Sequence, residues 1–352
     1  MEIRLPAEWE QQGAVMLAWP HSDSDWAQYL DEAKKCFSRI IKTIAKYQDV
    51  IVVQNTNSID DGLSLIANTP RVYTIKASSN DTWCRDYGFI TVLDNGKACL
   101  YDFKFNGWGL KFASNYDNMI NNHLYGQGLF INAKYVNMLG FVLEGGSIES
   151  DGIGTIMTTS DCLLSPNRNG GFSCQEIEDV LRKSFGARRI LMLNSGYLSG
   201  DDTDSHIDTL ARFCSTDTIA YVKCDDKSDP HYHSLKEMEK ELQKFTTPKG
   251  IPYNLVALPM ANAEYYNDER LPATYANFLI INNAILMPGY GTSLDIKAQA
   301  VLQKLFPGRE VYIIDCSVLI RQHGSLHCVT MQFPENIKLN RRFCNVSKQI
   351  QQ

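Results

Sequence analysis

Apolar positions along the chain follow a helical period in long segments and form short unbroken runs between them. Residues 27–47 place five apolar side chains on one helical face, namely Leu30, Phe37, Ile40, Ile41 and Ile44. An apolar strand at 50–53 follows this helix. The same order recurs at 175–185 before 189–193, at 234–245 before 253–258, and at 295–306 before 310–315. This alternation predicts an α/β protein.

Two asparagine-containing dipeptides interrupt the alternation. Asn95-Gly96 separates apolar runs at 89–93 and 97–103, and Asn282-Asn283 separates 278–281 from 284–287. These residues tolerate the positive φ angles of a tight hairpin turn. Because hairpins do not fit a doubly wound parallel sheet, each unit is predicted to be a small mixed sheet with one helix.

Five short segments that carry side chains suited to holding a guanidinium recur at intervals of roughly 60 residues, within the range of repeat arrays and propellers. They are Trp83-Cys84-Arg85-Asp86, Glu144-Gly145-Gly146, Asp204-Ser205-His206-Ile207-Asp208, Tyr275-Ala276-Asn277-Phe278 and Gly324-Ser325-Leu326-His327-Cys328. The spacing predicts five α/β modules that close around one site in a single domain, residues 1–352. A strand at 14–19 and a late strand at 326–331 are expected to complete one module together. The polar segment 338–352 is predicted to be a flexible tail.

Composition and charge narrow the class of partner. Of the 352 residues, 44% are hydrophobic and 21% charged, which is close to the globular average and allows a large core. The formal net charge of −6 argues against nucleic-acid binding and favours a small cationic partner. No apolar run approaches the ~20 residues that span a bilayer, and residues 1–10 lack a signal-peptide core. A cytoplasmic location without a membrane partner is therefore expected.

The ten cysteines include no CxxC pair, which argues against a disulfide or zinc framework. Cys328 is the first candidate nucleophile, and Cys84 is the second because on a strand it would face the same side as Asp86. On a strand, His206 and Asp208 also share a face. His327 would point away from its neighbour Cys328 and is interpreted as structural, so His206 is the expected partner of Cys328.

Each candidate taken alone has an ordinary structural explanation. Cys328 would be a buried thiol and His206 a hydrogen-bonded core histidine. Asp86 would pair with Arg85, and Glu144 would lead into a turn. Only the joint pattern of nucleophile, acid/base and paired carboxylates favours catalysis.

Two other classes of function fit parts of the same pattern. Asp202, Asp204, His206 and Asp208 alternate and would suit the ligands of a metal-dependent hydrolase, as would the pair His231 and His233. The same residues are also explained as acidic residues of a turn and as histidines of a solvent-exposed loop. A propeller can also serve as a non-catalytic binding module, because fold does not fix function.

Longer versions of the five segments resemble the agmatine deiminases of the guanidine-modifying, or pentein, superfamily over nearly the whole chain. The segments are Asn80-Asp81-Thr82-Trp83-Cys84-Arg85-Asp86-Tyr87-Gly88, Leu143-Glu144-Gly145-Gly146-Ser147, Asp202-Thr203-Asp204-Ser205-His206-Ile207-Asp208, Tyr275-Ala276-Asn277-Phe278 and Gly324-Ser325-Leu326-His327-Cys328-Val329-Thr330. The resemblance implies a five-module α/β propeller, the pentein fold, with its site on the axis. It also implies a homo-oligomer that hydrolyses agmatine to N-carbamoylputrescine and ammonia, a step toward putrescine in polyamine synthesis.

By match to the family motifs, Cys328 is the nucleophile, His206 the general acid/base and Glu144 its orienting partner. Asp86 and Asp208 are the carboxylates that hold the guanidinium, and Trp83 forms a wall of the pocket. A guanidinium is a planar cation and a poor electrophile, so its plane must be fixed before a thiolate attacks the carbon to give a covalent thiouronium. This chemistry requires no metal or organic cofactor.

The chain departs from the family pattern at two positions. Gln322-His323-Gly324 stands where a run of glycines is usual, and Ser205 stands where glycine is common. Neither change removes a catalytic group, but both affect the cavity wall. Peptidylarginine deiminase is therefore kept as the nearest alternative. That activity needs an open site, and closure of residues 104–111 over the pocket would decide against it.

Overall fold

The computed structural model describes residues 3–56 and 62–345, in which helices and strands form several small mixed sheets. Five sheets of the described chain have three or four strands, and one has two. The strands within these ranges do not join into one closed barrel. The α/β class predicted from the sequence is confirmed.

The two four-stranded sheets have the orders β19 (Met331–Pro334), β2 (Gln12–Ala18), β3 (Asp49–Gln54), β4 (Val72–Lys76) and β1 (Ile3–Arg4), β5 (Ile90–Asp94), β6 (Lys97–Lys104), β7 (Lys134–Val142). The three-stranded sheets are β10 (Arg189–Leu193), β9 (Thr155–Thr159), β8 (Ile148–Ser150); β11 (Ala211–Ser215), β12 (Thr218–Lys223), β13 (Asn254–Pro259); and β16 (Leu279–Ile281), β17 (Ala284–Gly289), β18 (Glu310–Asp315). The two-stranded sheet joins β14 (Tyr265–Tyr266) and β15 (Glu269–Arg270).

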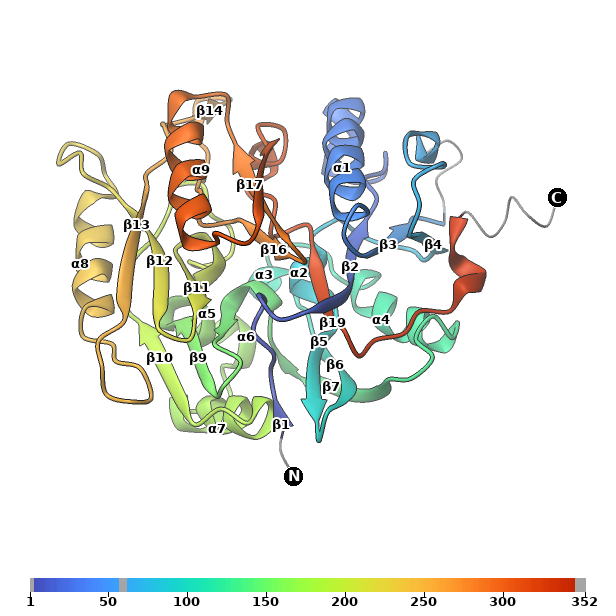
Figure 1. The fold of residues 1–352 in the computed structure, drawn as a ribbon, viewed down its shortest axis with the longest axis horizontal. Helices are drawn as coiled ribbons and strands as arrows, with labels where there is room; N and C mark the ends of the chain where they lie inside the picture. The colour runs from blue at the N-terminus through green and yellow to red at the C-terminus, as the bar shows by residue number, and fades with distance from the viewer. Residues whose placement is uncertain (1–2, 57–61, 346–352) are drawn as a thin grey trace.

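Long and very short helices have different places in the fold. The α-helices are α1 (Leu30–Ile44), α2 (Cys84–Tyr87), α3 (Gly107–Leu110), α4 (Asp117–Gly126), α5 (Ser160–Leu163), α6 (Pro166–Asn169), α7 (Cys174–Phe185), α8 (Tyr232–Leu242) and α9 (Ser293–Leu305). The 3-10 helices are η1 (Asp25–Tyr29), η2 (Leu63–Leu65), η3 (Gly145–Ser147), η4 (Ile207–Thr209), η5 (Ile320–Gln322) and η6 (Arg341–Phe343). In Figure 1, α1, α8 and α9 lie toward the outside, and α2 and α3 lie near the middle.

One structural unit recurs in each of the five larger sheets, because each combines an antiparallel pair with a parallel pair. The strands of a parallel pair need a crossover connection, which α1, α4, α7, α8 and α9 supply. The predicted helices and strands lie within a few residues of these elements, and both predicted hairpins form as β5–β6 and β16–β17. Asn95 and Gly96 have φ angles of 48° and 77°, as that hairpin turn requires.

The two ends of the chain meet in one sheet, as predicted. β19 pairs antiparallel with β2, so that Met331 lies opposite Met16. The predicted late strand at 326–331 is wrong, however, because residues 326–329 form a turn and β19 begins at Met331. The Thr330 backbone N–H donates to the carbonyl of His327 at 3.0 Å, which closes that turn. Cys328 therefore projects from a turn rather than from a strand.

The predicted tail at 338–352 is described only as far as residue 345. Within that part, Leu339 forms a β-bridge with Phe130, and Cys344 forms one with Tyr73. Residues 346–352 lie outside the described residues. In the described ranges, 3–56 and 62–345, none of the helices has both the length and the apolarity to cross a membrane.

Candidate functional site

A cavity of about 420 Å³ brings together residues from distant parts of the chain. Trp83, Asp86 and Cys328 line it, as the sequence predicted for one shared pocket. Asp208 lies directly behind Cys328, with 4.0 Å between its Oδ2 and the sulfur. His206 lies behind Asp86, with 3.7 Å between its Nδ1 and Asp86 Oδ1. Three of the five recurring segments thus contribute these residues to one site.

Asp86 is held at the cavity wall by two N–H donors. It lies on α2, where its Oδ1 accepts the Gly146 backbone N–H at 3.0 Å and its Oδ2 accepts the Trp108 indole N–H at 2.9 Å. Burial and the nearby charges of Asp208 and Glu144 raise the pKa of Asp86 well above its usual range. The Asp86 side chain is therefore fixed in place, and its ionised form is disfavoured unless a cation binds beside it.

Asp208 lies on η4, two residues after His206, and its pKa is shifted in the opposite direction to that of Asp86. Burial raises the pKa of Asp208, but the hydrogen bond and charge of His327 outweigh burial, so the pKa of this carboxyl lies below its usual value. His327 Nδ1 lies 2.8 Å from Asp208 Oδ2, and its Nε2 lies 2.7 Å from Glu8 Oε2. The other Asp208 oxygen, Oδ1, is buried without a hydrogen-bond partner. One oxygen of an ionised carboxylate is therefore free to bind a donor.

Cys328 has two oxygen atoms near its sulfur. Asn277 Oδ1 lies 3.4 Å away and also accepts the Cys328 backbone N–H at 3.4 Å. Burial, followed by the charges of Asp208 and Asp86, raises the pKa of the Cys328 thiol well above its ordinary value. The thiol is therefore protonated in the empty cavity and becomes a nucleophile only when a positive charge offsets the carboxylates.

Alkylation of Cys328 by the neutral reagent iodoacetamide is expected to be slow in the empty protein. Millimolar guanidinium chloride, which supplies the small cation without unfolding, is expected to accelerate it at least about tenfold, because one pKa unit corresponds to ~1.4 kcal/mol. Peptide mass spectrometry measures the rate at Cys328, and the exposed Cys174 provides an internal control whose rate should not change. Equal Cys328 rates with and without guanidinium would contradict this account.

His206 lies in a loop, so the prediction that it shares one face of a strand with Asp208 is wrong. It precedes η4, and the two residues before it, Asp204 and Ser205, have φ angles of 63° and 64°. This left-handed region favours glycine, which explains why glycine is common in the family where Ser205 stands here. Burial lowers the pKa of His206 to about 3, so its imidazole is neutral at pH 7. Its Nε2 is buried without a hydrogen-bond partner.

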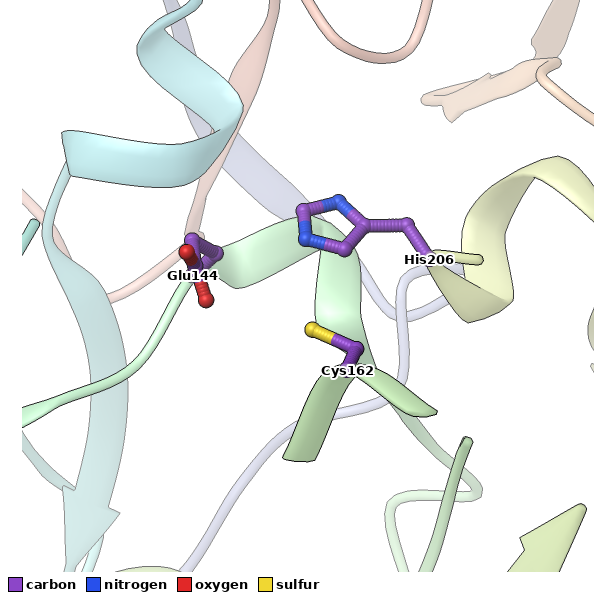
Figure 2. A group of neighbouring side chains, drawn as sticks. All are labelled: Glu144, Cys162 and His206. Atoms are coloured by element: carbon purple, nitrogen blue, oxygen red, sulfur yellow. The ribbon is translucent and has the colours of Figure 1, made fainter. Parts of the chain in front are cut away.

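Glu144 lies beside His206, but its two oxygens accept from another residue. Arg168 Nε donates to them at 2.8 and 2.9 Å. A ring nitrogen of His206 and an oxygen of Glu144 lie within 4.8 Å of each other and of Cys162 Sγ, and Figure 2 shows the three side chains converging. Burial raises the pKa of Glu144, and Arg168 partly offsets that effect. The predicted pairing of Glu144 with His206 is thus proximity without a hydrogen bond.

A chain of ion pairs connects this carboxylate to a segment over the cavity. Arg168 Nη1 lies 2.6 Å from Asp204 Oδ2, and Lys111 Nζ lies 2.7 Å from Asp204 Oδ1. Lys111 also donates to the Asp202 carbonyl at 2.6 Å. Residues 107–111 are therefore tied across to residues 202–204, and the Trp108 ring between them lines the cavity. Of the residues considered above as metal ligands, Asp204 has its carboxylate in these ion pairs, whereas Asp202 contributes only its backbone carbonyl.

Three residues of the site were missed in the sequence. Trp108 stands between Gly107 and Gly109, whose φ angles are 66° and 82°, and this glycine-flanked tryptophan was a usable signal for a shaped loop. Arg168 and Glu8 carry no local signal. They reach Glu144 and His327 only through tertiary contacts.

Cys84 does not share the cavity with Cys328. It lies in α2 and not on a strand, so its predicted common face with Asp86 does not exist. Its thiol is fully buried and donates to the carbonyls of Met16 and Val329, each at 3.2 Å. Burial raises its pKa strongly. Arg85 does not neutralise Asp86 either, because its guanidinium donates to Gln332 at 2.6 Å and to the His327 carbonyl at 3.3 Å.

Trp83 packs so closely on Gly324 that a side chain there has no room. A Cβ on Gly324 would lie 2.3 Å from the Trp83 ring, which also packs on Trp26 with 5.6 Å between ring centroids. Gly324→Ala is expected to displace Trp83 and raise KM for a guanidine substrate at least tenfold, about 1.4 kcal/mol. Steady-state kinetics measures this effect. Gly308→Ala is the control, since a Cβ there meets nothing within 4 Å, and an unchanged KM in the Gly324 variant would contradict the role of the Trp83 wall.

Comparison with known proteins gives matches along nearly the whole chain. The model of the Porphyromonas-type peptidyl-arginine deiminase family matches residues 4–334. A putative agmatine deiminase of Legionella pneumophila (strain Paris) is 36% identical over 339 residues, covering 95% of this chain and 96% of that protein.

Two solved structures are also similar. A putative arginine deiminase from Porphyromonas gingivalis is 50% identical, with a TM-score of 0.90 over 96% of this chain and 99% of that one. A cysteine-to-serine variant of the Campylobacter jejuni agmatine deiminase with substrate bound is 38% identical, with a TM-score of 0.87 over 94% of this chain and 96% of that one.

Proposed function

The chain belongs to the agmatine deiminases and matches the Porphyromonas-type peptidyl-arginine deiminase family, and on this premise we propose that it hydrolyses agmatine to N-carbamoylputrescine and ammonia. One observation carries the proposal. Cys328 lies at a cavity beside Asp86, with Asp208 behind it, so a nucleophile and two guanidinium-binding carboxylates meet at one point. The product is a precursor of putrescine, which places the reaction in polyamine synthesis.

Asp86 and Asp208 have complementary states for binding a guanidinium. The unpartnered Oδ1 of Asp208 is an available acceptor, and a bound cation offsets the burial and neighbouring charges that raise the pKa of Asp86. Charge-assisted hydrogen bonds of this kind contribute roughly 1.5 to 3 kcal/mol each. Two carboxylates fix the plane of the guanidinium and turn its carbon toward Cys328. The bound cation also stabilises the thiolate.

The reaction proceeds in two halves on this geometry. The Cys328 thiol gives its proton to neutral His206 as its sulfur attacks the guanidinium carbon, and the protonated His206 passes that proton to the departing nitrogen as the C–N bond breaks and ammonia leaves. This leaves a thiouronium on Cys328. Neutral His206 then accepts a proton from water, which attacks the same carbon, and breakage of the C–S bond releases the ureido product and the thiolate. Glu144, which lies within 4.8 Å of a ring nitrogen of His206, is the proposed orienting partner of that imidazole, and Trp83 supports the substrate.

The tail of the substrate meets an acidic surface, which supports agmatine over free arginine. Besides Asp86, the cavity is lined by five carboxylates, Asp23, Asp25, Asp81, Asp117 and Asp202. None of the described residues that line it is lysine or arginine. The amine of agmatine suits this surface, whereas the α-carboxylate of arginine is repelled by it. Burial raises the pKa of Asp81 to about 6 and that of Asp117 well above its usual range, whereas Asp23 and Asp25 are exposed at the rim.

Peptidylarginine deiminase is the second candidate, because the matching family model carries that description. A peptide would need space for its backbone at the mouth of the cavity. The contacts of Lys111 with Asp202 and Asp204 hold the Trp108 segment across this region. This closure favours a small substrate.

Ammonia release from agmatine, arginine and a blocked arginine peptide, each measured in chelator, tests these assignments. Agmatine is expected to have a kcat/KM at least about a hundredfold above the other two, or ~2.7 kcal/mol. Preferential peptide turnover would move the substrate assignment to the second candidate. No turnover of any guanidine by the folded protein would contradict the deiminase assignment and favour a binding module.

We also propose that the five larger sheets are the modules of one pentein propeller domain around this site. Support comes from the shared combination of antiparallel and parallel pairs in each sheet, and from the joining of the chain ends through β2 and β19. A cytoplasmic location and a homo-oligomeric state are further parts of the proposal that follow from the resemblance to the family. Light scattering on the purified chain tests the oligomeric state.

A further inference from the structure

Glu144, Cys162 and His206 form a buried group in which one atom, Nε2 of His206, has no hydrogen-bond partner. Each residue offers one ligand atom, and these atoms lie within 4.8 Å of one another. His206 Nε2 is buried and has no hydrogen-bond partner, whereas Nδ1 is near Asp86. Figure 2 shows that the ring nitrogen remote from the side-chain attachment, which is Nε2, faces Glu144 and Cys162. The unpartnered Nε2 of His206 thus faces the Glu144 carboxylate and the Cys162 thiol.

We propose that Glu144, Cys162 and His206 form an inhibitory binding site for a divalent transition metal, best matched by Zn²⁺. Carboxylate oxygen, thiolate and imidazole are ordinary zinc donors, with bond lengths of about 2.0 to 2.3 Å. Tetrahedral coordination at these lengths places donors about 3.3 to 3.8 Å apart. The present separations therefore need side-chain shifts of only about 1 Å.

The charges around the group also fit a divalent cation. Arg168 contacts both Glu144 and Asp204, so one positive charge is shared between two carboxylates. Binding converts the Cys162 thiol to a thiolate and releases one proton to solvent. With Glu144, Asp204 and the thiolate negative and Arg168 and Lys111 positive, the group then carries a net charge of −1, which favours a bound cation. Glu144 keeps further lone pairs for the metal while it accepts from Arg168.

A second buried group of similar composition is not suited to a metal, because an arginine already contacts its ligand atoms. Glu8, Glu149 and His327 also place their donors within 4.8 Å of one another. Arg212 already contacts all three, with its Nη2 3.0 Å from Glu8 and 3.1 Å from His327 Nε2. A guanidinium therefore occupies the position that a metal would take. In the group around Cys162, Arg168 donates hydrogen bonds to Glu144, and its other hydrogen bonds go to Asp204 and the Thr203 carbonyl rather than to Cys162 or His206.

Metal at this site inhibits the proposed reaction through His206. A metal bound to Nε2 withdraws electron density from the ring, so Nδ1 becomes a weaker base toward groups near Asp86. The three side chains are at most 1% exposed, so binding requires local opening and inhibition develops slowly.

Inhibition by zinc in Cys162→Ser tests the site, with Cys174→Ser as the matched control because Cys174 is exposed. Cys162 contacts no substrate in the proposed mechanism, so activity without metal is expected to remain near that of the parent. The zinc concentration for half inhibition is expected to rise at least about tenfold in Cys162→Ser and to stay unchanged in Cys174→Ser. Unchanged zinc sensitivity in a folded Cys162→Ser protein would overturn the proposal.

Because inhibition rests on the proposed function, metal binding is also measured without turnover. Cobalt(II) added to Cys328→Ser protein is expected to give a thiolate-to-cobalt absorption band, and the band is expected to be absent from the double variant with Cys162→Ser. X-ray absorption of zinc-loaded Cys328→Ser protein, which keeps Cys162, is expected to show one sulfur ligand. A band or sulfur ligand lost on changing Cys328 would assign the metal to the nucleophile and overturn the proposal.

Discussion

Cys328→Ser is expected to reduce ammonia release from agmatine by roughly 10⁴-fold or more, because it removes the nucleophile on which both halves of the reaction depend. Serine has nearly the size of cysteine, and its hydroxyl can still donate to Asn277 Oδ1, which lies 3.4 Å from the sulfur. The hydroxyl has a far higher pKa than a thiol, and the adjacent Asp208 raises it further. Steady-state assay of purified protein measures the loss.

Two cysteine variants make this result specific. Cys84→Ser and Cys174→Ser are expected to retain turnover, since Cys84 does not line the cavity and Cys174 is exposed. Agmatine affinity of Cys328→Ser, measured by calorimetry, should remain because Asp86 and Asp208 are unchanged. Loss of turnover in Cys84→Ser with activity kept in Cys328→Ser would transfer the nucleophile to Cys84 and contradict the mechanism.

His206→Ala is expected to lower kcat about 10²- to 10⁴-fold, the usual range for loss of a general acid/base, while KM changes much less. The reason is geometric. Its Nδ1 lies 3.7 Å from Asp86 Oδ1, and a Cβ added to Gly146 would lie 2.7 Å from that nitrogen and 3.1 Å from Asp208 Oδ2. The imidazole therefore lies among the groups that hold the guanidinium. Kinetics across a range of agmatine concentrations separates kcat from KM.

The matched control is His123→Ala, at an exposed histidine that contacts the Lys76 carbonyl and does not line the cavity. Its kcat is expected to equal that of the parent. A kcat within about threefold of the parent in His206→Ala would remove the acid/base role, since that difference amounts to only ~0.7 kcal/mol. A large KM increase with unchanged kcat would instead assign His206 to binding.

Local patterns predicted most of the regular structure. The period of Phe37, Ile40, Ile41 and Ile44 placed α1, and all four side chains are fully buried against the sheets. The turn residues Asn95 and Gly96 placed a hairpin, and the glycine at 186 ended α7 with a φ angle of 64°. These features depend on neighbours within a few residues, so the sequence expresses them directly.

Local patterns failed where long-range contacts override them. The apolar run around Cys328 resembles a strand, but His327 is bound to Asp208 and Glu8, which are 119 and 319 residues away, and the segment folds into a turn. His206 likewise follows two residues in the left-handed region and does not lie on a strand. At Cys328 the turn is fixed by the buried contacts of His327, whereas at His206 the Ser205 N–H donates to Asp201 and the His206 N–H donates to Thr203.

The sequence by itself determined the α/β class, the joining of the chain ends and, through resemblance to a family, the identity of Cys328, His206, Glu144, Asp86 and Asp208 as candidates. Only the tertiary structure decided how these groups are held and charged. Arg168 accompanies Glu144, and Trp108 donates to Asp86. The physical reason is that periodicity records which side chains become buried, whereas the pKa and direction of a buried polar group depend on partners that any part of the chain can supply.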